Sequence, residues 1–197
     1  MWDPRCKIKG ERRQALIQPA IDLGPTLLEC FGMEPTANML GKPLRQTIAN
    51  DTPVRDAAIF GIHGGHVNVT DGRYVYMRGP AGQENAPIYQ YTIMPTHMKA
   101  PFSVKELRTS QFAEPFSFTK GCPVMRIGHG HARMGKSTEM FPTLLFDLQE
   151  DPYQERPIKD AKVERQMTDH LVRLMREADA PADQYERLGV LEPAGVA

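Results

Sequence analysis

Apolar and polar positions follow the period of a β-strand in the middle of the chain, and this pattern predicts a sheet. Residues 57–62 form a continuous apolar run, which favours a buried strand. Residues 66–70 and 74–78 alternate between apolar and polar, and Asp71-Gly72 stands between them. Because Asp-Gly favours the positive φ angles of a tight turn, these two segments are predicted to pair as a β-hairpin.

Shorter patterns predict three more strands and one small helix. The strands are expected near 89–93, at 124–127 and at 143–148, and the helix near 104–112. The chain has 17 prolines and 16 glycines, so these elements are expected to be short and separated by loops.

Helical spacing marks a segment near each end of the chain. In the first, Asp22 suits the N-cap of a helix that starts at Leu23, Pro25 is tolerated in its first turn, and Gly32 can end it. The second predicted helix has an apolar face made of Val163, Met167, Leu171, Leu174, Met175 and Ala178.

Asp160 is predicted to cap this second helix and Pro181 to close it, with the remaining residues forming a tail. Two helices and a small, mainly antiparallel sheet give an α+β arrangement.

Charge balance, apolar runs and cysteine count argue against several classes of protein. Lys+Arg and Asp+Glu are equal at 24 each, so no basic excess indicates a nucleic-acid partner. No apolar run is long enough to cross a membrane, so no membrane association is expected. The three cysteines have no C-x-x-C spacing, which argues against a disulfide or zinc framework and favours a reducing, cytoplasmic location.

The stretch GHARMGKS at 130–137 fits the phosphate-loop pattern G-x-x-x-x-G-K-[ST]. That motif needs a strand before it and a helix after it, and the helix N-terminus then binds the phosphates. Here only a few residues separate Ser137 from the strand at 143–148, and Pro142 lies among them. A crossover between parallel strands takes a dozen residues or more, so we interpret the match as accidental.

Three histidines are candidate site residues. His63 and His66 occur in GIHGGH, beside glycines that allow close backbone approach. They leave a strand in opposite directions and have no third ligand nearby, so a strand-end turn is favoured over a metal site. If this turn faces a cleft, either imidazole could contact a substrate, and His97, in a proline-flanked loop, is a weaker candidate for the same rim.

Two other groups have simpler interpretations. Cys122 would need a neighbouring base to act as a nucleophile, and a small apolar residue near a turn is the simpler reading. Asp147, Glu150 and Asp151 are interpreted as a solvated turn rather than a metal site.

Several segments match one family in order and spacing, from about residue 14 to 190. They are AIDLGPTLLECFGMEP, MLGKPL, HVNVTDGRYVYMR, LLFDLQEDPYQERPI and HLVRLMREADAPADQYERLGV, with EPFSFTKGCPV and MPTHM between them. Together they resemble the C-terminal portion of bacterial sulfatases of the alkaline-phosphatase-like superfamily. Phe146 replaces the usual Tyr, and Tyr153-Gln154-Glu155 replaces the common Gly-Glu pair.

The resemblance implies a fold. In the family, this portion is a small antiparallel sheet with a β-hairpin and a C-terminal helix, beside the catalytic α/β domain. Residues 1–197 then form one subdomain, with a helix and hairpin at 14–78, a loop-rich insertion at 79–142, and a strand, terminal helix and tail at 143–197.

The resemblance also implies an activity that this chain does not hold alone. Sulfatases hydrolyse sulfuric esters with a formylglycine, made from the cysteine of C-x-P-x-R, and a calcium or magnesium ion. C-x-P-x-R does not occur here, because CPVMR at 122–126 has its proline one place early. No catalytic residue, metal ligand or bound cofactor is therefore assigned to this chain.

The expected role of the chain is to supply packing surface and active-site rim. The expected partner is a catalytic N-terminal sulfatase domain or partner chain, and homo-oligomers remain open. The alternative is a non-catalytic module that binds a partner chain. Sulfate, phosphate and phosphonate esters all remain open as substrates, because a fold does not choose among them.

Overall fold

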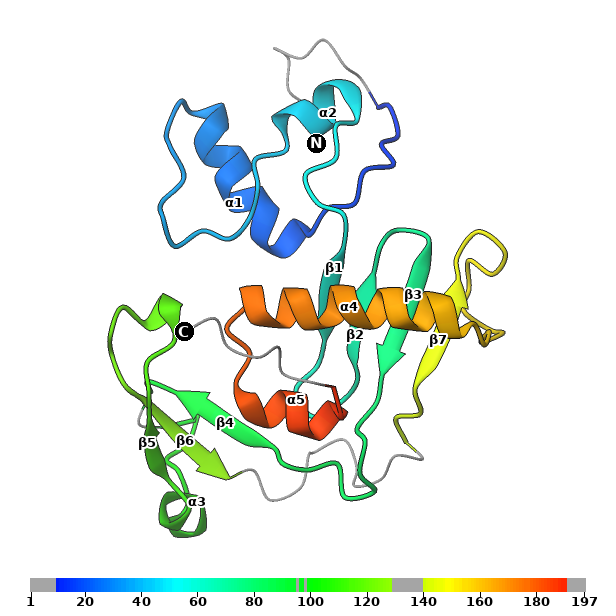
Figure 1. Ribbon diagram of the computed structural model, residues 1–197. Helices are drawn as coiled ribbons and strands as arrows, with labels where there is room; N and C mark the ends of the chain where they lie inside the picture. The colour runs from blue at the N-terminus through cyan, green and yellow to red at the C-terminus, as the bar shows by residue number, and fades with distance from the viewer. Residues whose placement is uncertain (1–9, 95, 98, 129–139, 191–197) are drawn as a thin grey trace.

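The protein is an α+β structure with two small antiparallel sheets (Figure 1). The computed structural model describes residues 10–94, 96–97, 99–128 and 140–190. The first sheet has the order β1-β2-β3-β7, and the second has the order β4-β6-β5. The strands are β1 (Ala58–Gly61), β2 (Val67–Thr70), β3 (Tyr74–Arg78), β4 (Tyr89–Thr92), β5 (Gln111–Ala113), β6 (Val124–Gly128) and β7 (Leu144–Asp147).

The predicted hairpin is confirmed as β2 and β3, which pair Thr70 with Val75. Asp71 shapes the turn, because its Oδ1 accepts hydrogen bonds from the backbone N–H groups of Arg73 and Tyr74, and Gly72 has a φ of 93°. The apolar run at 57–62 is a strand, but it is not buried on both faces. β1 lies at the edge of the sheet, which leaves Phe60 about half exposed.

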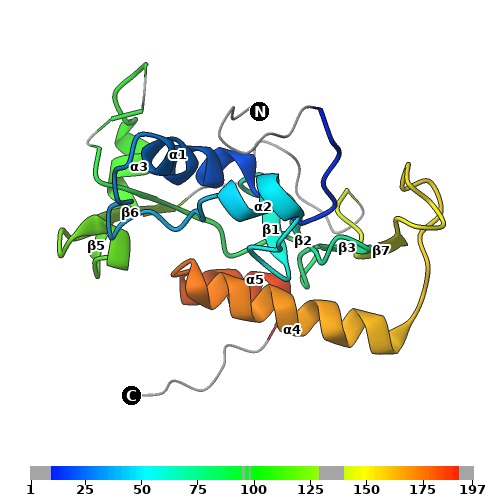
Figure 2. The ribbon, with the colours of Figure 1, turned by 90° about the horizontal axis from the view of Figure 1, so that it is seen from above.

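Helix α4 (Ala161–Glu177) covers one face of the first sheet, as Figures 1 and 2 show. Its predicted cap is confirmed, since the Asp160 side chain accepts from the N–H groups of Lys162 and Val163. Of the predicted apolar face, Met167, Leu171 and Met175 are buried and form one core with the sheet, Val163 and Leu174 are partly buried, and Ala178 is exposed. The members of this core are Ala57, Val69, Tyr76, Leu145, Met167, Leu171, Met175, Tyr185 and Leu188.

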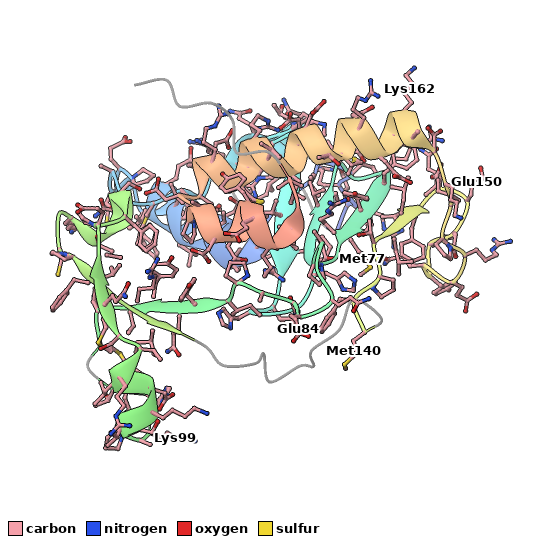
Figure 3. The ribbon with its side chains drawn as sticks, turned by 60° about the horizontal axis from the view of Figure 1, so that its bottom comes forward. Met77, Glu84, Lys99, Met140, Glu150 and Lys162 are labelled. Atoms are coloured by element: carbon pink, nitrogen blue, oxygen red, sulfur yellow. The ribbon has the colours of Figure 1, made fainter. Side chains whose placement is uncertain are left out.

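The opposite face of this sheet carries the alternate residues. Met77 of β3 lies there, on the side away from α4 (Figure 3). The same figure shows Lys162 pointing outward from the first turn of α4. Because successive side chains of a strand point to opposite faces, alternate residues enter the core under α4 or lie on the opposite face of the sheet.

A further helix, α5 (Ala182–Leu188), occupies a region expected to be tail. It starts after Pro181, ends at Gly189 in the left-handed conformation, and buries Tyr185 and Leu188 in the core. The segment is too short for periodicity to separate it from a loop. Burial against α4 and the sheet stabilises it instead.

The segment 79–142 contains the second sheet and the short helix α3 (Val104–Arg108), as well as loops. Ser103 and Glu106 form a complete capping box at α3. The helix ends earlier than predicted, because Gln111–Ala113 pairs with β6 as β5. A single-turn 3-10 helix, η2 (Ser117–Thr119), precedes β6.

Helix α1 (Pro19–Cys30) starts four residues before the predicted position, so Asp22 is not its N-cap. Asp22 lies inside the helix, fully buried, and its Oδ2 accepts from the backbone N–H of Gln18 at 2.7 Å. Its Oδ1 forms an ion pair with Arg55 at 2.5 Å. The predicted end is confirmed, since Gly32 follows the helix with a φ of 72°.

The segment 39–44 lies against α1. Lys42 donates its backbone N–H to Asp22, and Leu44 donates its own to Thr26 Oγ1. A Cβ on Gly41 would lie 1.8 Å from the Ile21 carbonyl oxygen, so only glycine fits there. We name these five residues, Asp22, Thr26, Gly41, Lys42 and Leu44, the α1 clasp.

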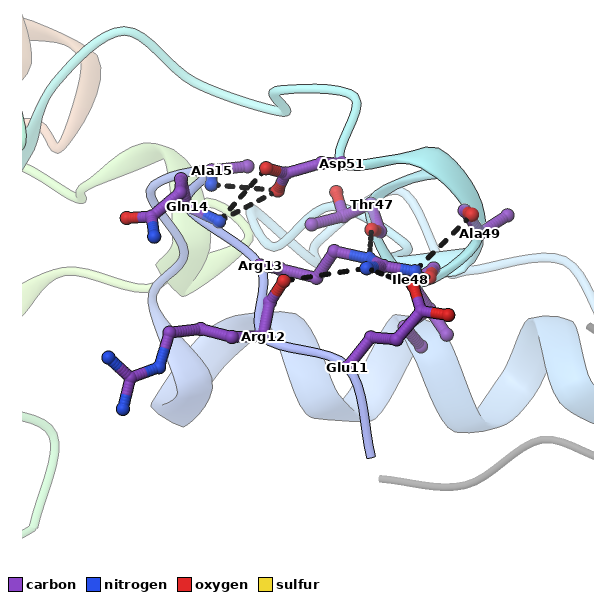
Figure 4. Close-up of polar contacts among 9 residues, drawn as sticks. All are labelled: Glu11, Arg12, Arg13, Gln14, Ala15, Thr47, Ile48, Ala49 and Asp51. Atoms are coloured by element: carbon purple, nitrogen blue, oxygen red, sulfur yellow. Dashed lines mark hydrogen bonds and ion pairs between the residues drawn. The ribbon is translucent and has the colours of Figure 1, made fainter. Parts of the chain in front are cut away.

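Helix α2 (Arg45–Asn50) was not predicted, because it is a short element in a proline-rich segment. Its last carbonyls accept hydrogen bonds from Arg13, including Nη2 to Ile48 O at 2.7 Å (Figure 4). Asp51, which follows α2 in the left-handed conformation, accepts from the N–H groups of Gln14 and Ala15. A cation at the C-terminus of a helix satisfies carbonyls that have no partner within the helix.

Within the described residues, no helix combines the length and apolar character that a bilayer crossing requires.

Candidate binding cleft

His63 and His66 lie in the turn between β1 and β2, and both line the same pocket. His63 Nε2 is 3.1 Å from the carbonyl oxygen of Tyr89, and His66 Nε2 is 2.8 Å from that of Pro142. Because a carbonyl only accepts, each Nε2 carries the hydrogen. The turn therefore faces a cleft. The sequence analysis names this as the condition under which either histidine could contact a substrate.

The cleft runs between this turn, β4 and α5. One pocket has a volume of about 310 Å³, and an adjoining pocket of about 450 Å³ shares His63 and Gln184 with it. The remaining lining residues are Ile59, Phe60, Gly61, Ile62, Gly64, His66, Val67, Ile88 and Arg187 in the first pocket, and Tyr89, Gln90, Tyr91 and Pro181 in the second. The walls are mainly apolar with a few polar groups, as in many ligand sites.

Two buried polar side chains hold the histidine turn in place. Asn85 donates its amide to Gly64 O at 2.8 Å, and Arg187 Nη1 donates to Gly65 O at 3.1 Å. Arg187 Nη1 also donates to Asn85 Oδ1 at 3.1 Å. Sequence reasoning missed both residues, because each becomes meaningful only beside a turn distant in sequence.

Tyr91 connects the second sheet to α5. Its hydroxyl donates to Asp183 Oδ1 at 2.5 Å. Burial, and then the hydrogen bond to Asp183, raise the pKa of Tyr91 to about 12, so this phenol keeps its proton at neutral pH. This hydrogen bond joins β4 to α5 beside the second pocket, which Tyr91 lines.

The chemistry of the cleft is suited to binding. No serine, threonine or cysteine is among the described residues that line it, and Tyr91 is held protonated. The cleft offers imidazoles, an amide and a guanidinium beside apolar walls. Such groups orient a ligand, whereas nucleophilic catalysis needs a nucleophile next to a base.

The structure does not bring His97 to this cleft. His97 Nε2 contacts Glu106 Oε1 at 2.8 Å, and its ring packs on Phe102. It thereby supports the first turn of α3, the helix that lies between β4 and β5 in the chain. His97 is therefore a structural neighbour of α3 and does not line the cleft with His63 and His66.

We expect Glu106 to titrate near pH 2. Hydrogen bonds from the Ser103 side chain and backbone, followed by the bond to His97, lower the pKa of Glu106 from 4.5 to about 2. A depressed carboxyl pKa means that the contribution to α3 stability is complete above pH 4.5 and is lost as the pH falls toward 2. NMR titration of the Glu106 side chain measures this midpoint.

In the same experiment, Ser103→Ala should move the Glu106 midpoint up further than His97→Ala, because Ser103 supplies the larger effects. A wild-type midpoint near 4.5 would contradict the capping-box geometry.

The acidic turn at Asp147, Glu150 and Asp151 has a structural role. Asp147 forms an ion pair with Arg73 at 2.8 Å, and Asp151 accepts from the backbone N–H of Arg156, so the acidic turn is partly buried rather than solvated. Among described residues, no group of three His, Cys, Asp or Glu side chains is placed to hold a metal ion.

The phosphate-loop match at 130–137 lies outside the described residues. The strands on either side of it, β6 and β7, belong to different antiparallel sheets. They therefore do not form the parallel β-α-β unit that a phosphate loop requires.

No protein-family model matches the chain. A search of curated proteins finds no match either.

Proposed function

We propose that this chain is the C-terminal part of a sulfatase-like enzyme, a sulfuric ester hydrolase of the alkaline-phosphatase-like superfamily. It supplies packing surface and active-site rim to a catalytic α/β domain or partner chain. The proposal includes a cytoplasmic location, where the exposed thiol of Cys122 stays reduced. The observation that carries the proposal is the inverted burial of α1.

Helix α1 buries polar residues and exposes apolar ones. Asp22 and Thr26 are almost fully buried, whereas Leu27 is 51% exposed and Phe31, which follows the helix, is 80% exposed. We name the exposed apolar residues of this region the α1 surface: Ile17, Ile21, Leu23, Leu27, Phe31, Met33, Met39 and Leu40. A helix that exposes this many apolar side chains is typical of an interface, and a catalytic domain is the occupant that the family resemblance suggests.

The segments that resemble sulfatases also contact one another. The α1 clasp joins AIDLGPTLL to MLGKPL through the backbone bonds of Lys42 and Leu44. The ion pair between Arg73 and Asp147 joins the hairpin segment to LLFDL. Residues that match the family pattern thus contact other residues that match it. Such contacts between matching segments support common ancestry over chance matching.

The cleft with His63 and His66 supports the rim role. It is open, partly apolar and lined by hydrogen-bonding groups, and it lacks a nucleophile of its own among the lining residues. A rim of this kind orients a substrate whose reacting bond lies in another domain.

The test is to read the DNA next to the coding sequence and to express any adjoining segment together with this chain. We expect a segment that encodes C-x-P-x-R and metal-binding aspartates, and hydrolysis of 4-nitrophenyl sulfate by the joint product only. Enzymatic turnover by the purified chain alone would overturn the proposal that catalysis belongs to another domain or chain. An adjoining sequence without these motifs would overturn the sulfatase assignment.

Phe31→Asp should abolish association with the catalytic domain, because it replaces the most exposed apolar side chain of the α1 surface by a charge. Phe112→Asp is the matched control, since Phe112 is 89% exposed on β5 in the second sheet. Both variants should leave the stability of this chain within about 0.5 kcal/mol of wild type, because both side chains are exposed. Analytical ultracentrifugation of the mixed proteins measures the association, and equal weakening by both variants would refute α1 as the contact.

The alternative is an interaction module that binds a partner without catalysis, and the same α1 surface favours it. Under this alternative, Phe31→Asp still prevents association, but the assembled complex does not hydrolyse 4-nitrophenyl sulfate. Self-association of the lone chain that Phe31→Asp removes would instead identify a second copy as the occupant.

A further inference from the structure

Arg187 is a buried cation that forms no ion pair with any of the described residues. Its side chain is 2% exposed, and no carboxylate among the described residues lies within ion-pair distance of its guanidinium. Burial lowers the pKa of this guanidinium and the charge of Asp183 partly opposes the shift, but arginine remains protonated at neutral pH. A buried charge is normally neutralised by a partner, so the deficit calls for an anion.

The hydrogen bonds of Arg187 go to neutral acceptors. Nε donates to Gln184 Oε1 at 3.0 Å, and Nη1 donates to Gly65 O and Asn85 Oδ1, each at 3.1 Å. Nη2 has no acceptor among the described residues. No hydrogen bond joins Asp183 to Arg187, and the Asp183 oxygens accept from Tyr91 and Gln184 instead.

Arg187 lines the first pocket of the cleft, the one that also contains His63 and His66. Apolar side chains of Phe60, Ile62 and Ile88 form other parts of its wall. Three neutral acceptors hold the guanidinium in one orientation, so the two remaining N–H groups, both on Nη2, point in fixed directions. The Nη2 group can therefore donate charge-assisted hydrogen bonds to the oxygens of a carboxylate, sulfate or phosphate group.

We propose that this pocket binds an oxyanion through Arg187. The ligand is a sulfate, phosphate or carboxylate, either free or carried on an apolar body that packs on Phe60 and Ile88. This inference goes beyond the proposed function, because it requires no nucleophile and no catalytic domain. It can therefore fail or hold independently of the sulfatase assignment.

The experiment is calorimetric titration of the 197-residue chain with inorganic sulfate, phenyl sulfate and benzoate at constant ionic strength, with benzamide as the neutral analogue. We expect saturable binding of the anions, none of benzamide, and a shift of the Arg187 side-chain Nε–H NMR signal. Equal affinity for inorganic and phenyl sulfate assigns the site to a free ion. Preference for phenyl sulfate assigns it to an anion on an apolar body.

Two variants make the test specific. Ile62→Glu adds a negative charge at the exposed edge of the pocket, and it should weaken anion binding about tenfold. Ile62→Gln has almost the same shape, so it should stay within about twofold of wild type. Arg187→Lys should also weaken binding, because a lysine cannot donate to Gln184, Gly65 and Asn85 and present a further N–H group to the anion as the planar guanidinium does.

Ile62 donates no side-chain hydrogen bond, so the Ile62 pair remains informative even if Arg187→Lys fails to fold. Absence of saturable anion binding would overturn the proposal. Equal binding by Ile62→Glu and Ile62→Gln would overturn it as well, as would an unmoved Arg187 signal.

Discussion

Asp22→Ala should lower the free energy of unfolding by about 3–5 kcal/mol, because it leaves Arg55 as a buried charge without its partner. Asp22 is fully buried and Arg55 is 10% exposed in a pair only 2.5 Å long. The substitution also removes the acceptor of two backbone N–H groups, those of Gln18 and Lys42. Urea denaturation measures the loss, and hydrogen exchange at these two amides locates it.

Removing both charges should cost less than the sum of the two single changes. In Asp22→Ala/Arg55→Met no uncompensated charge is buried, so the coupling in the double-mutant cycle should be favourable. Asp169→Ala, at an exposed position of α4, serves as a carboxylate control and should change stability by less than about 0.5 kcal/mol. Additive effects of the two single variants would show that Asp22 and Arg55 do not form the pair in solution.

Gly41→Ala should displace the segment 39–44 from α1 and lower the free energy of unfolding of the protein by about 3 kcal/mol. The added Cβ would lie 1.8 Å from the backbone oxygen of Ile21, and backbone cannot move aside as a flexible side chain can. The hydrogen bonds of the α1 clasp would then break. We expect fast hydrogen exchange at Lys42 and Leu44, and weaker association with any partner that binds the α1 surface.

Gly24→Ala is the matched control for Gly41→Ala. Gly24 lies in α1 with no atom within 4 Å of an added Cβ, so alanine there should stabilise the helix by about 1 kcal/mol. If the two alanine variants were equally stable, the close approach of Gly41 to α1 would be refuted.

Local patterns determined much of the fold. The Asp71-Gly72 turn and its flanking alternation predict β2 and β3, because strand period and turn chemistry act over a few residues. The spacing from Val163 to Met175 and the cap at Asp160 predict α4 for the same reason. His63 and His66 could be chosen as rim candidates, since glycine-flanked histidines after a strand are visible in the sequence.

Tertiary contacts decided the rest. Helix α5 and strand β5 are too short for a periodic signal, and they exist because Tyr185 and Leu188 bury against α4 and because β6 offers a free edge. The burial of α1 could not be predicted, because its buried side is set by an ion pair with Arg55 across 33 positions.

The cleft shows the same division. The sequence by itself determined which side chains have useful chemistry, because residue type fixes charge and hydrogen-bonding capacity. Only the tertiary structure decided that Arg187 stands beside Gly65, 122 positions away, and that His97 stays with α3 instead. A binding site is a property of distances between distant segments, and those distances arise only when the core formed by α4, α5 and the first sheet brings the segments together.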